Sequence, residues 1–404
     1  MMKHRWIALC SACLLLGGCF FLKDEAGSGP DGSEISSDQV NADEINPVER
    51  SRTEQTLDDP LLGSFYRDQL SVPQRELYDR MAEGILQGEM TYTLKDLDRE
   101  DLACVWVALT SDHPEFFWLN QYTYLLNNDG NDYLRLVDEP DPQEVAAIEQ
   151  AADAIIDAMP SGLDEAQRAE YLYRLLIDQT VYDSASENNQ DIRSVLLNGT
   201  SVCAGYAKAY ELLCRKAGVG CTIVSGRALP FDEDEATAHS WNLMKVNGEY
   251  CWSDVTWGDQ EPENNPEGYT MSYLMVPDDV IYARHCFDNT LQMQDTAIPN
   301  IFTMPAANDS SLSWYARNNL CFDYYNREQM SALIDQTLSV DNPRVEVQFS
   351  NDQAYREAID DLRRQDDNLY FDKGWQIYGW SETIAVSYID FDDARSIIFW
   401  ITPV

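Results

Sequence analysis

Positive charge and histidine are both scarce in this sequence. Lys and Arg number 28 against 70 Asp and Glu, which gives a formal net charge of -42. A surface this acidic repels the phosphates of nucleic acids and of anionic lipids, so we expect no nucleic-acid partner. Only four histidines occur in 404 residues, at positions 4, 113, 239 and 285, so the choice of an imidazole base is narrow.

The N-terminus has the pattern of an exported protein. Lys3 and Arg5 precede the apolar run Trp6 to Leu16, which is too short to span a bilayer and is followed by small residues. The stretch Leu16-Gly-Gly-Cys19 resembles the lipobox of bacterial lipoproteins. The resemblance implies a signal peptide over 1–18, lipidation of Cys19 and an extracytoplasmic protein anchored to the lipid bilayer. The alternative is an ordinary secretory signal followed by an incidental cysteine.

Apolar residues are few between positions 19 and 58, where acidic and small polar residues dominate. Such a segment cannot bury enough surface to offset the entropy lost on ordering. We therefore expect a disordered acidic tether over 19–58, with the folded part of the chain held near the membrane by the anchor.

Compact cysteine motifs are absent after the expected signal peptide. Seven cysteines follow Cys19, at positions 104, 203, 214, 221, 251, 286 and 321. Their odd number and wide spacing indicate no small disulfide framework, although some of them could pair outside the cytosol. No CxxC pair or histidine-rich cluster remains to bind zinc, so we expect neither a metal nor a cofactor.

The order of predicted elements indicates an α+β protein with three folded parts. Residues 59–160 are mainly helical, with a hairpin predicted from the two aromatic runs that flank 128–131; this turn lacks the spaced acidic ligands of a calcium loop. Residues 161–300 combine helices over 164–180 and from 203 with strands between 221 and 257. Residues 301–404 are predicted to form a small α+β domain, and their sequence does not indicate its role.

Cys203 is placed where a thiol becomes a nucleophile. It directly precedes a helical stretch, Ala204 to Ala217, which Gly218 ends. The positive end of the helix dipole favours the thiolate, and the N–H of Cys203 points where an oxyanion would form. The plainer alternative is a buried cysteine that serves as a small apolar residue, which is how we interpret Cys214.

A hairpin predicts that His239 and Asp254 meet. Asn247-Gly248 is a strong two-residue turn signal, and it pairs Val246 with Glu249. In that register, positions whose numbers sum to 495 face each other, so Asp254 is the diagonal neighbour of His239 on the same sheet face. A slip of one residue would place the two on opposite faces. Taken singly, each has a structural alternative, as a sheet histidine or an edge carboxylate.

These residues resemble a known family. Ser201-Val-Cys-Ala-Gly-Tyr, Ala238-His-Ser-Trp-Asn and Tyr250-Cys-Trp-Ser-Asp-Val-Thr-Trp are similar to the three core motifs of bacterial transglutaminase-like proteins. The resemblance spans about 165–260 and implies a papain-like α+β core, in which the cysteine helix packs on an antiparallel sheet. It also implies a catalytic triad in which Cys203 is the nucleophile, His239 the base and Asp254 the residue that orients the base.

Other nearby residues carry less specific signals. Trp241 and Trp257 could wall the acyl site, and Tyr206 could shape the oxyanion region, but packing roles account for all three. The acidic run 232–235 could attract an amine-bearing or cationic substrate, although a solvated loop is the commoner explanation. His113 and His285 show no partner set in the sequence, and we interpret both as structural.

The sequence thus favours a surface-anchored thiol acyltransferase or hydrolase that acts on amide bonds of protein, peptide or cell-wall peptide through a thioester at Cys203. The alternative is a non-catalytic binding or scaffold lipoprotein that keeps the same core. Thiol–disulfide exchange is disfavoured, because Cys203 has no resolving cysteine two or three residues away.

Overall fold

The computed structural model describes residues 40–41, 59–120, 122–125, 132–230, 235–260, 268–288, 290–293, 296–337, 344–363 and 384–403. The expected signal peptide, Cys19, most of the expected tether and the turn at 128–131 lie outside these ranges. Within the described residues, no helix has the length and the apolar composition needed to span a bilayer. The seven cysteines after Cys19 are all free thiols, five of them buried.

The first part of the described chain after residue 58 consists of two packed helices and a small sheet. These are α1 (Val72–Leu86), α2 (Arg99–Asp112), β2 (Thr91–Thr93), β3 (Tyr122–Leu125) and β4 (Tyr133–Leu136). β3 pairs antiparallel with β4, which confirms the predicted hairpin strands. Two hydrogen bonds tie this region to the core: Arg215 donates to the Asp112 carbonyl at 2.5 Å, and the Tyr66 hydroxyl donates to the Ile223 carbonyl at 2.7 Å.

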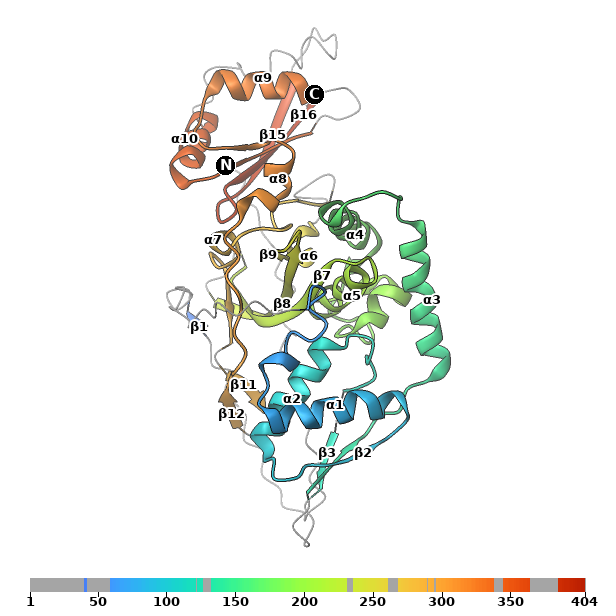
Figure 1. Ribbon diagram of the computed structural model, residues 1–404. Helices are drawn as coiled ribbons and strands as arrows, with labels where there is room; N and C mark the ends of the chain where they lie inside the picture. The colour runs from blue at the N-terminus through green and yellow to red at the C-terminus, as the bar shows by residue number, and fades with distance from the viewer. Residues whose placement is uncertain are drawn as a thin grey trace.

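The central part is an antiparallel sheet that packs against helices on both faces (Figure 1). Its helices are α3 (Pro142–Ala158), α4 (Glu165–Gln179), α5 (Cys203–Lys216), α6 (Val255–Gly258) and α7 (Asp278–Ile281). Its strands are β7 (Gly220–Ala228), β8 (Glu235–Val246), β9 (Glu249–Ser253) and β10 (His285–Phe287). β8 pairs with β7 and β9, β10 adds to β7, and the two-residue strand β1 (Val40–Asn41) pairs with the start of β8.

The two faces of β8 pack against different cores. Met244 and Val246 join the residues of α4 and α5, whereas Trp241 and Leu243 join the core that includes α1 and α2. Successive side chains of a strand point to opposite faces, so this alternation follows directly from the sequence. The expected α+β architecture, with the cysteine helix packed on an antiparallel sheet, is confirmed.

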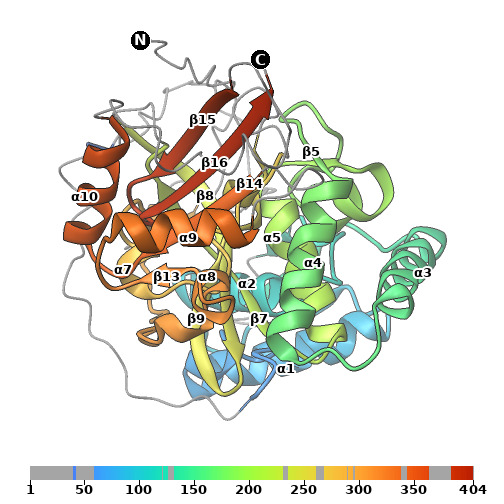
Figure 2. The same cartoon turned by 90° about the horizontal axis from the view of Figure 1, so that it is seen from above.

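The C-terminal part forms a four-stranded sheet in the order β13-β14-β16-β15, covered by helices (Figure 2). Its elements are α8 (Trp314–Arg317), β13 (Cys321–Phe322), α9 (Arg327–Thr337), β14 (Arg344–Phe349), α10 (Asp352–Arg363), β15 (Ile384–Phe391) and β16 (Ser396–Pro403). The expected helix and strands of this part are confirmed. Side chains join it to the core: the Tyr273 hydroxyl contacts Asp393, and Ser272 and Ser396 are hydrogen bonded.

The remaining short elements connect these parts. They are the 3-10 helices Arg67–Gln69 and Ser310–Leu312, the π-helical turn Ser194–Asn198, and the strands β5 (Val181–Tyr182), β6 (Thr200–Ser201), β11 (Thr290–Met293) and β12 (Thr296–Pro299). The predicted domain boundaries at 161 and 301 stay predictions.

Candidate active site

Cys203 is the first residue of α5, as the sequence predicts. Its side chain is 1% exposed, and Val202 in extended conformation precedes it as the N-cap. The Asn242 amide donates to the Ala207 carbonyl at 2.9 Å, which fixes the first turns of α5 against β8. Since the first N–H groups of a helix have no partner within it, the N–H of Cys203 is available to an oxyanion.

The hairpin that carries His239 and Asp254 has the predicted register. Val246 pairs with Glu249 and Asn242 with Ser253, and Asn247 and Gly248 both have positive φ, which is typical of a type I′ turn. One detail of the prediction is wrong: β9 ends at Ser253, and Thr256 lies in α6 rather than in a strand opposite His239.

The early end of β9 follows from a capping contact. Asp254 is the N-cap of α6, and its Oδ1 accepts a hydrogen bond from the backbone N–H of Trp257 at 2.9 Å. The backbone N–H of Asp254 itself donates to the Tyr273 carbonyl at 2.9 Å. The carboxylate that the sequence places on a strand is therefore held more rigidly, by a helix start.

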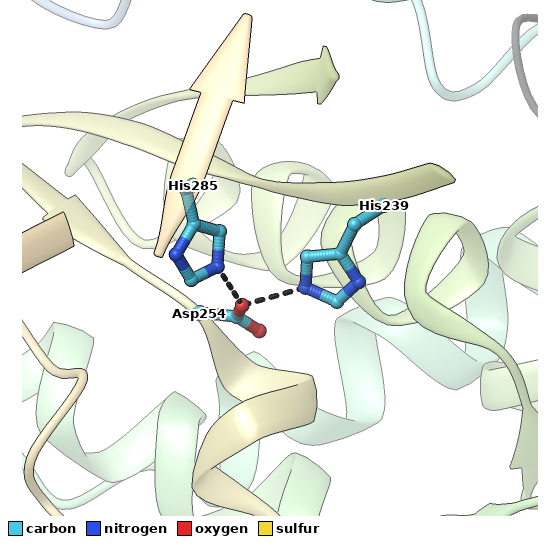
Figure 3. A group of neighbouring side chains, drawn as sticks. All are labelled: His239, Asp254 and His285. Carbon is cyan, nitrogen blue, oxygen red and sulfur yellow. Dashed lines mark hydrogen bonds and ion pairs between the residues drawn. The ribbon is translucent and has the colours of Figure 1, made fainter. Parts of the chain in front are cut away.

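His239 and Asp254 are in direct contact. His239 Nε2 lies 2.7 Å from Asp254 Oδ2, and Asp254 is fully buried (Figure 3). Burial opposes the charged imidazole, but the carboxylate of Asp254 outweighs it and raises the pKa of His239 to about 10. Burial also opposes ionisation of the carboxylate, yet His239 and then His285 hold the pKa of Asp254 well below its usual range.

The second ring nitrogen of His239 is left for the thiol. Nε2 faces Asp254, and a hydrogen bond with Cys203 is a further cause of the raised pKa of His239. The structure therefore brings together all three residues of the predicted triad, from α5, β8 and the start of α6.

His285 completes the cluster, and the sequence-based interpretation missed it. Its Nε2 lies 2.9 Å from the same Asp254 Oδ2, and its Nδ1 lies 3.0 Å from the Ile281 carbonyl oxygen. The expectation that His285 has no partner set is wrong. It is 1% exposed, and burial lowers its pKa despite the hydrogen bond to Asp254. The only feature of the sequence that points to a role for His285 is the small number of histidines. His113 instead hydrogen-bonds Glu115 and stacks on Phe116.

Aromatic rings surround the imidazoles. The Trp241 ring stacks on His239 with centroids 6.1 Å apart, and Trp257 lies 5.9 Å from His239 and 4.4 Å from His285. Trp241 Nε1 is buried and has no hydrogen-bond partner among the described residues. The Tyr206 hydroxyl donates to Asp259 at 2.6 Å. An acyl-wall or oxyanion role for these three residues stays a prediction.

Two imidazoles and a carboxylate are also a donor set that suits zinc. The ligand atoms of His239, Asp254 and His285 lie within 4.8 Å of one another. However, the two nitrogen–oxygen contacts measure 2.7 and 2.9 Å, which are hydrogen-bond lengths. Ligands of a tetrahedral zinc ion with bonds of roughly 2.0 Å lie about 3.3 Å apart. The observed geometry fits hydrogen bonds.

Two further features do not join this site. A cavity of about 930 Å³ lies along α4 and is lined by Asp164, Glu170, Arg174 and Arg317 among others, but by no triad residue. Positions 232–234 of the acidic run lie outside the described residues.

Comparison with known proteins fits this geometry. Residues 152–257 match the family model described as the transglutaminase-like superfamily, and this segment contains Cys203, His239 and Asp254. The chain contains a transglutaminase-like core. Proteins of this superfamily include cysteine-dependent acyltransferases and proteases, and the core supplies the residue types that both need.

The relatives of the transglutaminase-like core are distant. The human kyphoscoliosis peptidase is 23% identical over 141 residues, which are 32% of this chain and 21% of that protein. The mouse kyphoscoliosis peptidase is also 23% identical, over 132 residues that are 30% of this chain and 20% of that protein. The chain thus spans about a fifth of the length of these curated relatives.

Solved structures resemble the core only loosely. A crystal structure of a TGase covers 34% of this chain and 44% of its own, with 13% identity and a TM-score of 0.26. The periplasmic domain of TgpA from Pseudomonas aeruginosa covers 31% and 55%, with 18% identity and a TM-score of 0.21. Likenesses this low do not bear on the activity of this chain.

Proposed function

We propose that this protein is a surface-anchored thiol enzyme that cleaves or transfers amide bonds of protein, peptide or cell-wall peptide through a thioester at Cys203. The observation that carries the proposal is the Cys203–His239–Asp254 arrangement, in which His239 Nε2 lies 2.7 Å from a fully buried carboxylate and the Cys203 thiol is a further cause of the raised pKa of His239. A binding module has no need of all three groups in contact.

In the first half of the reaction, His239 accepts the thiol proton and the Cys203 thiolate attacks the amide carbonyl carbon. The oxyanion forms beside the N–H of Cys203 at the start of α5. His239 then gives the proton to the leaving amine, the carbon–nitrogen bond breaks, and the acyl group remains on sulfur. Asp254 stabilises the imidazolium that exists between these two proton transfers.

In the second half, water or an amine attacks the thioester. His239 takes the proton of the attacking group, the carbon–sulfur bond breaks, and the proton returns to the thiol. A hydrolase and a transferase therefore share every step up to the thioester. Which product forms depends on whether water or an amine reaches the acyl group first.

Anchoring to the membrane is the second element of the proposal. It is supported by the lipobox-like Leu16-Gly-Gly-Cys19 stretch and by the acidic segment that follows it. Membrane fractionation of the wild type and of Cys19→Ser tests it: the wild-type protein should sediment with membranes, and the variant should not. Recovery of both proteins in the soluble fraction would contradict anchoring.

The catalytic proposal is tested with glutamine, peptide and peptidoglycan-stem amides, each with and without an added primary amine. We expect wild type, but not Cys203→Ala, to release ammonia or amine, or to incorporate the added amine. Cys214→Ala is the matched control, since Cys214 is a buried thiol of the same helix away from His239. Turnover that survives Cys203→Ala would refute the thioester mechanism.

One observation keeps a second function in view. Cys203 and His239 are only 1% and 7% exposed, so a substrate must displace some of what covers them. A scaffold lipoprotein that holds a partner through its flanking regions accounts for so closed a site. Partner binding that persists in Cys203→Ala, with no turnover by wild type, would support this second function.

A further inference from the structure

His285 shares the triad carboxylate with His239. The two imidazoles approach Asp254 from different strands, β10 and β8, and both point their Nε2 atoms at Oδ2, at 2.9 and 2.7 Å (Figure 3). With the Trp257 N–H on Oδ1, the buried carboxylate faces three nitrogen atoms. A triad needs only one imidazole on its carboxylate, so the second one calls for an explanation.

Strand β7 lies between β8 and β10, which carry the two imidazoles, and its Gly226 lets β10 pack closely. Gly226 pairs with His239 on one side and with Phe287 on the other. A Cβ atom at this position would lie 2.2 Å from the Cys286 carbonyl oxygen and 2.9 Å from the Trp241 ring. Because no side chain stands there, β10 packs directly on β7 beside the Trp241 ring, and the ring centroids of His239 and His285 lie 5.4 Å apart.

Hydrogen-bond accounting fixes the role of each nitrogen of His285. The Ile281 carbonyl can only accept, and so can the ionised carboxylate of Asp254. To donate hydrogen bonds to both acceptors, the His285 ring would need a proton on each nitrogen and would be charged. Burial disfavours this charged form and lowers the pKa of His285. The contact with the carboxylate is charge-assisted and is the stronger of the two, so Nε2 keeps its proton when the ring is neutral.

We propose that His285 is a positioning residue, which donates its Nε2–H to Asp254 Oδ2 and so divides the carboxylate between two imidazoles. The inference rests on the proposed function, in which Asp254 stabilises the imidazolium of His239. A carboxylate oxygen that already accepts one strong hydrogen bond stabilises a second donor less. His285 thereby limits how tightly His239 holds its proton, and His239 can still pass that proton to the leaving amine.

The remaining titratable groups around Asp254 do not compete for this role. Tyr173 and Tyr273 are in electrostatic contact with it, and burial raises the pKa of both well above the ordinary value, so both stay neutral. Arg284, next to His285, lies 3.1 Å from Asp392 and 4.0 Å from Asp393. The charge that Asp254 shares is therefore divided between His239 and His285.

The test compares His285→Phe, which keeps a ring but has no N–H, with His285→Gln, which restores a donor. In His285→Phe, the whole carboxylate acts on His239. The pH midpoint of Cys203 alkylation by iodoacetamide should then fall by about one unit, a tenfold change in proton affinity. Amide turnover should also fall about tenfold, because the imidazolium gives up its proton less readily. His285→Gln should restore both values.

A lower midpoint means faster alkylation of Cys203 at a given pH, so a positioning role predicts faster alkylation together with slower amide turnover. Damage to the fold would lower alkylation and turnover together, and that outcome would overturn the proposal, as would an unchanged midpoint in His285→Phe. His113→Phe is the matched control, since His113 also faces a carboxylate, Glu115 at 2.7 Å, and stacks on an aromatic ring. The alkylation midpoint needs no substrate, so it tests His285 even if the amide substrates of the proposed function prove wrong.

A measurement on the wild-type chain decides the point if His285→Phe does not fold. His4 lies in the expected signal peptide, so three histidines remain after it, and nitrogen NMR of the labelled imidazoles gives few signals. Single substitutions of His113 and His239 assign the signals of His285. We expect a proton on His285 Nε2 at every pH across the alkylation midpoint. An unprotonated Nε2 in that range would overturn the proposal.

Discussion

Replacing Asp254 with Asn tests how much of the reactivity of Cys203 depends on one buried charge. The pKa of His239 is raised from 6.5 to about 10, mainly because the Asp254 carboxylate outweighs the effect of burial. A shift of about 3.5 units corresponds to about 5 kcal/mol of net preference for the imidazolium, which remains after the opposing effect of burial and includes a contribution from Cys203. In Asp254→Asn this preference disappears, and burial then favours the neutral ring.

The consequence can be calculated for the thiol. In the wild type, His239 is charged at neutral pH, and an imidazolium beside a thiol favours the thiolate form. Asp254→Asn removes this imidazolium, and a free thiol without such a partner is only a few per cent ionised near pH 7. Alkylation of Cys203 by iodoacetamide at about pH 7 should therefore slow by roughly 30-fold or more. The Asn side chain also favours the wrong tautomer of His239, which lowers amide turnover further.

The assay follows alkylation at each cysteine by mass spectrometry over a range of pH. The half-buried Cys286 and Cys321 serve as internal references in the same sample. Asp278→Asn is the matched control, because Asp278 is also a buried carboxylate but accepts its hydrogen bond from Trp252. If the pH profile of Cys203 in Asp254→Asn superimposes on that of the wild type, the charge of Asp254 does not activate the thiol, and the reasoning fails.

Two further predictions concern stability. Gly226→Ala should lower the free energy of unfolding by about 3 kcal/mol, because a Cβ atom 2.2 Å from the Cys286 carbonyl oxygen would force β10 away from β7. Chemical denaturation measures this loss against Gly63→Ala, whose Cβ would meet only an ordinary contact, 3.5 Å from Asp59. Burial raises the pKa of Glu211 from 4.5 to about 8, so the folded state keeps a proton that the unfolded chain releases. The free energy of unfolding should therefore fall by at most a few kcal/mol as pH rises from about 5 to about 8. Urea unfolding midpoints measured over this pH range should fall with pH in the wild type and should change less with pH in Glu211→Gln. A slope of the opposite sign would contradict the protonated state of Glu211.

Local patterns predicted much of the candidate site. The start of α5 at Cys203 follows from a helical stretch with a stop at Gly218, and the His239–Asp254 contact follows from one turn, because the Asn247-Gly248 dipeptide fixes the pairing of every residue on both strands. Pairing extended too far in the prediction. Strand β9 ends at Ser253 because Asp254 caps the start of α6. The capping hydrogen bond replaces the strand pairing that the prediction extended to Thr256.

His285 could not be found in this way. It lies 31 residues after Asp254, and its strand, β10, pairs with β7 rather than with either strand of the predicted hairpin. No turn signal links β10 to β7, and a three-residue strand has no periodicity of its own to read. The pairing instead depends on a glycine, Gly226, whose importance shows only when the neighbouring Trp241 ring and the Cys286 carbonyl are in place.

By itself, the sequence determined the parts of this protein that depend on neighbours along the chain: its acidity, its helices, the register of one hairpin and the thiol at a helix start. Only the tertiary structure decided how many groups share Asp254 and how deeply Cys203 is covered, since both depend on packing between distant segments. A buried charge is set by everything that surrounds it in space. For that reason, the sequence predicted Cys203, His239 and Asp254, and the structure added His285 to this cluster.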